Sequence, residues 1–263
     1  MITARLSRIP KRVRDDLKII RLLKNWREVL SAKASNVGYD HLVFRNGVEL
    51  RAPSEVTLDF LFHEIWIDET YAPPGYEIDR GDTVVDIGAN IGVFALWAAT
   101  RAEGIRVKSY EPFPKNAEYF LTNLSASKST SIEFYQVAVA DSEGTRTLHV
   151  DDAWILHSLN AKGSEEEGLT VDTITLDTVF ADVEACNLLK LDCEGSEYEI
   201  MYSASDETLS KIEKIVCEFN NVDEGRQNGA SLRGFLLSRG FVIDPSGPLD
   251  GESGFLCARR VHG

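Results

Sequence analysis

Positively charged residues are outnumbered by negatively charged ones in this sequence. Its 263 residues include 28 Lys and Arg against 42 Asp and Glu, which leaves a formal net charge of −14. Proteins that bind nucleic acid through its phosphates normally present a basic face. The acidic balance therefore argues against a nucleic-acid partner and leaves small or neutral ligands open.

Cysteines are few and long apolar runs are absent. The four cysteines form no C-x-x-C pair, which disfavours a zinc site of that type. Unpaired, buried thiols fit a reducing compartment. No apolar stretch approaches the roughly 20 residues that a membrane-spanning helix needs, and the N-terminus has no signal-peptide core. We therefore expect a cytoplasmic protein.

The dinucleotide-binding fingerprint G-x-G-x-x-G is also absent, and a different glycine turn is present. Residues 83–87 are mostly β-branched and apolar, which is typical of a short buried strand. Gly88 and Gly92 follow, and then a run of helix-forming residues. A strand, a tight glycine turn and a helix form the first unit of a nucleotide-type α/β sheet.

Two acidic residues accompany this turn. Asp86 precedes the first glycine by two residues, and Glu111 ends the next expected strand. A carboxylate at the first position would repel a pyrophosphate but suits a positively charged ligand such as a sulfonium. The second carboxylate stands where ribose hydroxyls are usually bound. Together the two acids and the turn predict a site for S-adenosylmethionine (SAM).

Strand-like and helix-like segments alternate from residue 81 onward. The expected strands are 83–87, 106–110, 132–137, 187–192, 213–218, 240–243 and 254–259, and the expected helices are 92–102, 115–126, 173–183, 196–204 and 229–239. Repeated βα units predict an α/β fold with a Rossmann-like, doubly wound, mostly parallel sheet. In such a fold a ligand binds at the carboxyl ends of the strands. Because the alternation begins at residue 81, we expect the catalytic domain to span 81–263.

Residues 1–35 differ from the rest in charge. They contain ten basic and three acidic residues, and apolar residues recur every three or four positions. This pattern predicts a basic amphipathic helical arm that becomes regular after Pro10. The arm could lie on an anionic membrane surface, as a peripheral contact. Docking of its apolar stripe on the body of the protein or on a second subunit is the more common use of such a helix.

Residues 36–80 are expected to form a hairpin and a segment that covers the cofactor. Asn46 and Gly47 separate two alternating runs, which is a strong hairpin signal. The stretch 58–66 is apolar at helical spacing and lies just before the nucleotide-type strand. Tyr71 follows it, either in contact with the ligand or as a packed aromatic residue.

Several motifs, taken in order, resemble the FkbM-type SAM-dependent methyltransferases. The segments that carry the resemblance are 86–92, 110–114 with Asn116, 137–141 followed by Gly144, 176–177 and 189–197. They cover roughly residues 81–220. One segment departs from the pattern, because His157 stands where the first serine of a Ser-Ser-Leu-like stretch is usual.

The resemblance implies a seven-stranded class I methyltransferase fold. It also implies transfer of the SAM methyl group to a hydroxyl of a sugar, a glycan or a natural product. Carried over residue by residue, the family pattern lines the methionine half of SAM with Asp86, Gly88, Ala89, Asn90 and Gly92. It places Glu111 on the ribose and Pro112, Phe113, Val137 and Ala138 beside the adenine.

The acceptor hydroxyl must lose a proton, so a base within hydrogen-bond reach is expected. Asp192 and Glu194 follow the strand at 187–192 and are the candidates for this base, or for a group that orients the acceptor. A structural or cofactor-contacting acid is the alternative for Asp192, and a helix-start acid for Glu194. Lys190 lies in an otherwise apolar strand, so we expect it to pair with a carboxylate and tune it. His157 is a second candidate base, with a hydrogen-bonded loop histidine as the alternative.

The sequence leaves a possible metal site and several alternative functions open. The side chains of Asp192, Glu218 and Asn220 could supply three oxygen ligands to a magnesium ion. A hydrogen-bonding rim is the more common arrangement at strand ends, so we assign no metal ligand. Methylation of a nucleic-acid base is an alternative function, but the segment 192–195 lacks the Asn/Asp-Pro-Pro-aromatic tetrad of exocyclic-amine methylation. A non-catalytic SAM-binding scaffold is another. A nicotinamide-dependent oxidoreductase is disfavoured because its fingerprint is missing.

Overall fold

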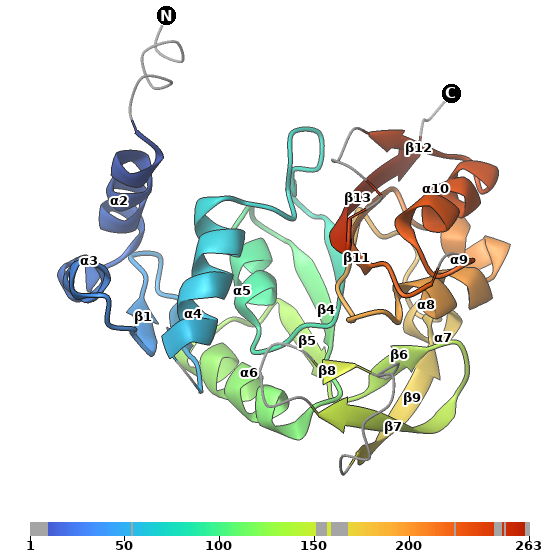
Figure 1. The fold of residues 1–263 in the computed structure, drawn as a ribbon, viewed down its shortest axis with the longest axis horizontal. Helices are drawn as coiled ribbons and strands as arrows, with labels where there is room; N and C mark the ends of the chain where they lie inside the picture. Colours follow the sequence, from blue (N-terminus) through green and yellow to red (C-terminus); the bar gives the residue numbers. More distant parts are fainter. Residues whose placement is uncertain are drawn as a thin grey trace, which may run out of the picture.

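The structure is a computed structural model, and it describes residues 10–53, 55–150, 157–158, 168–223, 225–244, 249 and 251–260. At 55–57, 149–150 and 157–158 it describes the backbone alone. The described residues form a seven-stranded sheet, a four-stranded sheet, a short hairpin and the helices around them (Figure 1).

The seven-stranded sheet is the centre of the fold. Its strands are β3 (Thr83–Ile87), β4 (Arg106–Tyr110), β5 (Ile132–Tyr135), β10 (Leu188–Leu191), β11 (Lys214–Asn220), β12 (Phe241–Asp244) and β13 (Ser253–Arg260). They lie in the order β12-β13-β11-β10-β3-β4-β5. β13 runs antiparallel to its neighbours β11 and β12, and the other neighbouring pairs are parallel. The predicted mostly parallel, seven-stranded sheet is therefore confirmed, with strand ends that differ by at most two residues.

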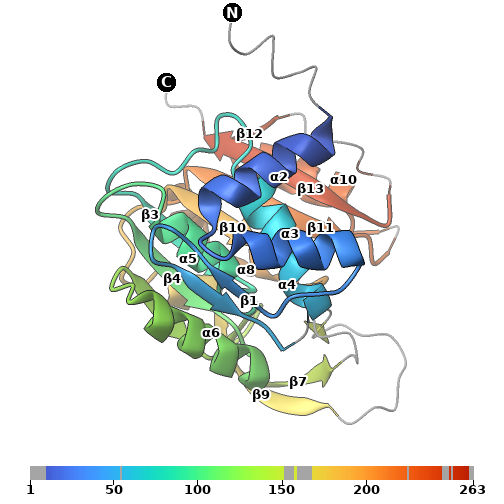
Figure 2. The same cartoon turned by 90° about the vertical axis from the view of Figure 1, so that its left-hand side faces the viewer.

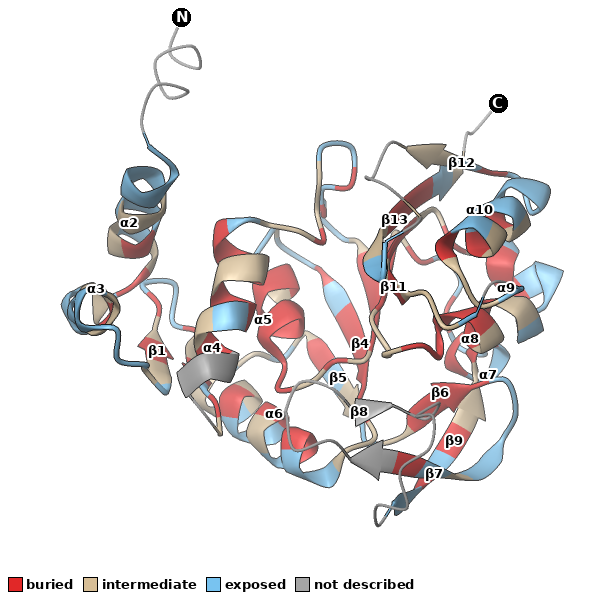
Figure 3. Cartoon of the chain, viewed as in Figure 1, coloured by how far each residue is buried: buried red, intermediate tan, exposed pale blue. Residues whose placement is uncertain are grey.

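Helices cover both faces of this sheet, because successive strand residues point to opposite sides. Val84 belongs to one buried cluster and Val85 to the other. The first cluster is closed by α5 (Val93–Ala99) and α6 (Pro114–Ser127), and the second by α8 (Glu197–Ser203), α9 (Asp206–Ser210) and α10 (Gly229–Ser238). Figure 1 shows α5 on one side of the sheet and α8 to α10 on the other. In Figure 3 the buried residues concentrate on α5 and the inner strands. The doubly wound arrangement is as predicted.

The prediction of a helix at 173–183 is wrong except at residues 176–179. Residues Leu169–Thr175 form the strand β9, and the helix α7 is limited to Leu176–Val179. β9 pairs with β6 (Ala138–Ala140) and with β7 (Gly144–Val150), which in turn pairs with β8 (His157–Ser158). The resulting four-stranded sheet was not predicted. It lies beside the carboxyl ends of the central strands and contributes to the cavity described below.

From residue 10 onward, the N-terminal arm forms two helices, α2 (Lys11–Leu22) and α3 (Trp26–Ser35). Ile19, Leu23 and Val29 have no exposed surface and belong to the same cluster as α5, whereas Val13 and Leu17 are about half exposed. Part of the apolar stripe therefore docks on the body of the protein. Figure 2 shows α2 and α3 lying side by side over this face. Across the described part of the chain, every helix is too short or too polar to cross a membrane.

Three elements connect the arm to the central sheet. The predicted hairpin is present as β1 (His41–Val43) and β2 (Glu49–Arg51). It is followed by α4 (Glu55–Phe62), which continues into a π-helical turn, η1 (His63–Ile67). π-helical turns are rare in proteins, and where they occur they are often part of a functional site. Residues of α4 and η1 line the cavity, so the segment before β3 does lie over it.

Candidate functional site

A cavity of about 250 Å³ lies at the carboxyl ends of β3, β4 and β10, where the strand order reverses. Such a switch point is the usual ligand site of an open α/β sheet. Of the residues singled out from the sequence, those lining it are Gly88, Ala89, Asn90, Glu111, Pro112, Asn116, Ala138, Lys190, Asp192, Glu194, Glu218 and Asn220. Further lining residues that the sequence did not single out as site residues include Phe60, Leu61, Glu64, Tyr110, Val139 and Leu148.

The glycine turn lies directly against the end of β10. Gly88 has φ +77°, and a Cβ atom there would be 1.7 Å from the carbonyl oxygen of Asp192. No residue with a side chain fits this approach. Asn90 also has a positive φ, and its side-chain oxygen accepts a hydrogen bond of 2.8 Å from the backbone N–H of Ile91. The turn therefore exposes its backbone to the cavity without side-chain cover.

Glu111 is held in place at the end of β4 by three donors. One carboxylate oxygen accepts from the backbone N–H of Asn90 at 3.0 Å, and the other from the backbone N–H of Phe113 at 2.9 Å. The amide of Asn116 donates at 3.4 Å. Burial raises the pKa of Glu111 to about 7, against the lowering effect of these hydrogen bonds. A fixed carboxylate thus faces the cavity at the position expected to bind ribose.

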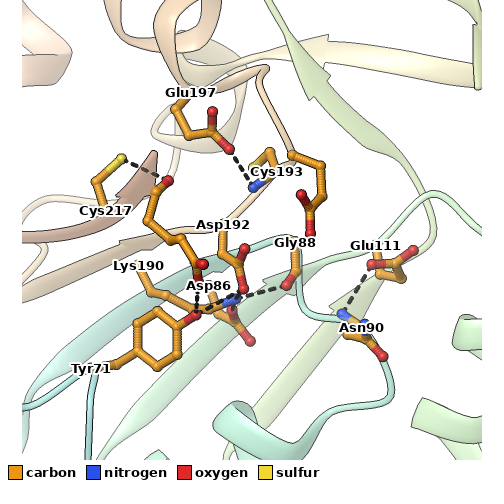
Figure 4. A network of polar contacts seen from close by, with 12 residues as sticks. Tyr71, Asp86, Gly88, Asn90, Glu111, Lys190, Asp192, Cys193, Glu197 and Cys217 are labelled. Carbon is orange, nitrogen blue, oxygen red and sulfur yellow. Dashed lines mark hydrogen bonds and ion pairs between the residues drawn. The ribbon is translucent and has the colours of Figure 1, made fainter. Parts of the chain in front are cut away.

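Asp86 lies behind the cavity wall, which differs from the expectation that its carboxylate faces the ligand. Its side chain has no exposed surface, and the ammonium of Lys190 lies 3.2 Å from Oδ1 (Figure 4). Lys190 also donates to the carbonyl oxygen of Gly88 at 2.7 Å and lies 3.5 Å from Oδ2 of Asp192. Burial lowers the pKa of Lys190, but Asp86 and Asp192 outweigh it and raise it overall. The expected pairing of Lys190 with carboxylates is therefore present, and Asp86 is its buried partner.

Acidic side chains gather at one end of the cavity. Asp192 and Glu218 both lie within hydrogen-bond distance of the hydroxyl of Tyr71, and Asn220 donates to Glu194 at 3.3 Å. Burial, followed by the charges of neighbouring carboxylates, raises the pKa of Glu218 to about 7 and that of Glu194 to about 8. Perturbed carboxyl groups that converge in a cavity are typical of functional sites.

Glu64 belongs to this acidic end, and the sequence analysis missed it. It lies on η1 and lines the cavity, and burial together with Glu218 and Asp192 raises its pKa to about 8. Glu64 is an ionisable residue within the mostly apolar run 58–66, but it shares this signal with Asp59 and His63, so the sequence alone does not single it out.

The turn after β10 is stabilised by Glu197, which does not line the cavity. Its carboxylate is fully buried and accepts from the backbone N–H of Cys193 at 2.7 Å and from that of Gly195 at 3.0 Å. Glu194 and Gly195 both have positive φ values. Glu197 thus compensates a strained turn, and this turn presents Glu194 to the cavity.

Three further residues expected at the cofactor lie outside the cavity lining. Gly92 begins α5 with φ +85°, and a Cβ there would be 2.9 Å from the ring of Phe120, so its role is close packing. Phe113 packs on the small cluster of the four-stranded sheet, and Val137 packs on the second core cluster. His157 lies in β8, but its side chain is outside the described residues.

The suggested magnesium site finds no support in the described residues. Among them, no group of three or more His, Cys, Asp or Glu side chains could hold a metal ion. Instead, Asp192 and Glu218 contact Tyr71, and Asn220 contacts Glu194. These strand ends form a hydrogen-bonded rim.

The sequence of this chain is similar to those of several known methyltransferases. It is 28% identical over 230 residues to the 31-O-demethyl-FK506 methyltransferase FkbM of Streptomyces tacrolimicus, covering 75% of this chain and 87% of that protein. It is 25% identical over 146 residues to the hexuronic acid methyltransferase AglP of Haloferax volcanii, covering 55% and 58%.

A solved structure also aligns with it, namely the magnesium protoporphyrin IX methyltransferase (ChlM) of Synechocystis PCC 6803 with bound SAM. The alignment covers 78% of this chain and 79% of that one, with a TM-score of 0.45 and 13% identity. Residues 86–243 match the methyltransferase FkbM domain. This match spans more than half of the sequence and includes the glycine turn, Glu111 and, at the acidic end of the cavity, Asp192, Glu194 and Glu218. The chain therefore belongs to the FkbM methyltransferase family.

Proposed function

We propose that this protein is a SAM-dependent O-methyltransferase that acts on a hydroxyl group of a sugar, a glycan or a natural product. The observation that carries the proposal is the cavity at the switch point, with Glu111 at one wall and the Lys190–Asp192 pair at the other. The name of the relative from Streptomyces tacrolimicus describes an acceptor that lacks a methyl group on an oxygen, which supports O-methylation.

The side chains of the cavity fit SAM. Ala138, Val139 and Leu148 offer an apolar wall of the kind an adenine needs, and the Glu111 carboxylate can accept hydrogen bonds from ribose hydroxyls. The carboxylates at the acidic end suit a sulfonium and an ammonium group. Bound there, SAM would supply a methyl group activated by its sulfonium.

At the acidic end, the chain itself supplies a base and holds it in place. Asp192 lines the cavity and is fixed by Lys190 and by the hydroxyl of Tyr71. An ionised carboxylate in this position can accept the proton of an acceptor hydroxyl. Phe60, Leu61 and Ile65 cover the cavity from α4 and η1, which limits access of water to the acceptor. Glu194 lines the same cavity as Asp192, and its carboxyl group can orient the acceptor through a hydrogen bond.

The test is incubation with methyl-labelled SAM and a panel of sugars, oligosaccharides and polyketide alcohols. Mass spectrometry should find a labelled product, and NMR should place the methyl group on oxygen. Asp192→Asn should lose transfer by about 100-fold or more and keep SAM binding, since general base catalysis contributes about 10²–10⁴-fold. Asp206→Asn, on exposed α9, is the control and should keep both. A product methylated on nitrogen, or wild-type protein that does not bind SAM, would contradict the proposal.

A further inference from the structure

Tyr71 is the residue that joins the two best-placed carboxyl groups of the acidic end. It follows η1, is 1% exposed, and packs edge-on against Phe94 and Phe255 at 5.6 and 5.5 Å between ring centroids. Its ring lies 5.2 Å from the ammonium of Lys190 (Figure 4). This packing fixes the direction in which the hydroxyl points.

The hydroxyl oxygen of Tyr71 lies 2.9 Å from Oδ2 of Asp192 and 3.0 Å from Oε2 of Glu218. A phenol has one proton, and an ionised carboxylate can only accept. Burial and the neighbouring carboxylates raise the pKa of Tyr71, so its hydroxyl keeps that proton. One phenol proton makes one well-aligned hydrogen bond. A second proton, held by one of the two carboxyl groups, gives both oxygen–oxygen contacts good geometry, so the arrangement favours one protonated carboxyl group.

The surrounding charges decide which one. Lys190 lies 3.5 Å from Asp192, whereas no cation lies within ion-pair distance of Glu218 in the described part of the chain. The other ionisable groups around the trio are Glu64 on η1, Glu194 after β10, Asp86 on β3 and Cys193. Apart from Lys190 they are acids, so they favour a neutral Glu218. The charge then lies on Asp192, beside the only cation of the group.

We propose that Tyr71 is a positioning residue: protonated Glu218 donates to its hydroxyl oxygen, and the hydroxyl donates to Asp192, which stays ionised and correctly oriented. This rests on the proposed function. The proton that leaves the acceptor hydroxyl goes to Oδ1 of Asp192. The electron pair of the acceptor oxygen forms the bond to the methyl carbon, and the pair of the broken carbon–sulfur bond stays on sulfur. The proton on Glu218 remains in place throughout.

The test is a pH titration by ¹³C NMR of protein labelled with [δ-¹³C]glutamate. The signal missing from Glu218→Gln identifies Glu218, and in wild type its midpoint should lie well above the ordinary carboxyl range. Tyr71→Phe keeps the ring and its packing but removes the acceptor of the protonated carboxyl. It should lower the midpoint of Glu218 by one pH unit or more, a tenfold loss of proton affinity. Tyr76→Phe is the matched control, because its hydroxyl contacts Asp244 and not this site.

Two results would overturn the inference and leave the proposed function intact. One is a wild-type Glu218 that titrates in the ordinary carboxyl range, and the other is a midpoint that Tyr71→Phe leaves unchanged, as a purely packing role for Tyr71 requires. SAM binding is measured on the same wild-type sample by calorimetry. Its absence would overturn both the proposed function and this inference.

Discussion

The ammonium of Lys190 lies 3.2 Å from Oδ1 of Asp86, and both side chains are almost completely shielded from solvent. The two residues are direct partners in the parallel register of β10 and β3. Since Lys190 also donates to the carbonyl oxygen of Gly88, one side chain ties the central strands to the glycine turn. The buried pair therefore supports the geometry of the cavity.

Lys190→Met should be strongly destabilising, because it leaves the carboxylate of Asp86 buried without a counter-charge. Removing one partner of a buried pair costs about 3–5 kcal/mol. Lys108→Met is the matched control: Lys108 is also buried in a strand, but its partner Asp182 is 69% exposed. The expected cost there is under about 1 kcal/mol for the lost ion pair. Urea unfolding at pH 7 measures both, and equal losses would contradict a special role for the Lys190–Asp86 pair.

Gly88→Ala should disrupt the turn, because the new methyl group would lie 1.7 Å from the carbonyl oxygen of Asp192. We expect a loss of at least about 1–3 kcal/mol from overpacking alone. Gly47 has a similarly positive φ of +97° in the hairpin, but has open space around its Cβ position. Gly47→Ala thus carries the conformational cost without the clash. Thermal unfolding should separate the two, with Gly88→Ala melting at the lower temperature.

The central sheet could be predicted because its signals are local. Segment 83–87 is a short, mostly apolar and β-branched run, and segment 106–110 is a short run containing Val107 and Tyr110 that follows a turn. The structure has strands at these same residues. The seven-stranded arrangement followed from the ordered family motifs. Glu111 could be placed at the cavity for the same reason, since it ends a strand of a βαβ unit.

The parts that could not be predicted depend on contacts between distant residues. The sequence presented Asp86 as a free acid, because its partner Lys190 lies 104 residues away and meets it only through the strand register. Thr173 to Thr175 were read as the start of a helix, although they pair with β6 in a parallel sheet. The β-branched threonines and isoleucine there favour a strand, but that signal alone did not reveal the partner strand.

The docking of the arm can be tested by two substitutions on the same helix. Ile19 is completely buried, and Ile19→Ala should cost about 2–5 kcal/mol. Leu17 is 48% exposed, and Leu17→Ala should change the stability by less than about 1 kcal/mol. Urea unfolding distinguishes them. Similar small effects of both would show that α2 does not pack on the body in solution.

The central claim is that the acidic cavity binds a cationic sulfur compound. Calorimetry should compare the dissociation constants of SAM and S-adenosylhomocysteine between pH 6 and 7.5, since the two differ by the charged methyl sulfonium. Glu111 has a pKa of about 7, so it loses its proton and becomes negative as the pH rises through this range. Opposite unit charges about 8 Å apart attract by about 2 kcal/mol at an effective dielectric constant of about 20. We predict that the preference for SAM rises by up to about tenfold over this range. A preference that stays constant or falls with pH, or failure of either compound to bind, would contradict the account.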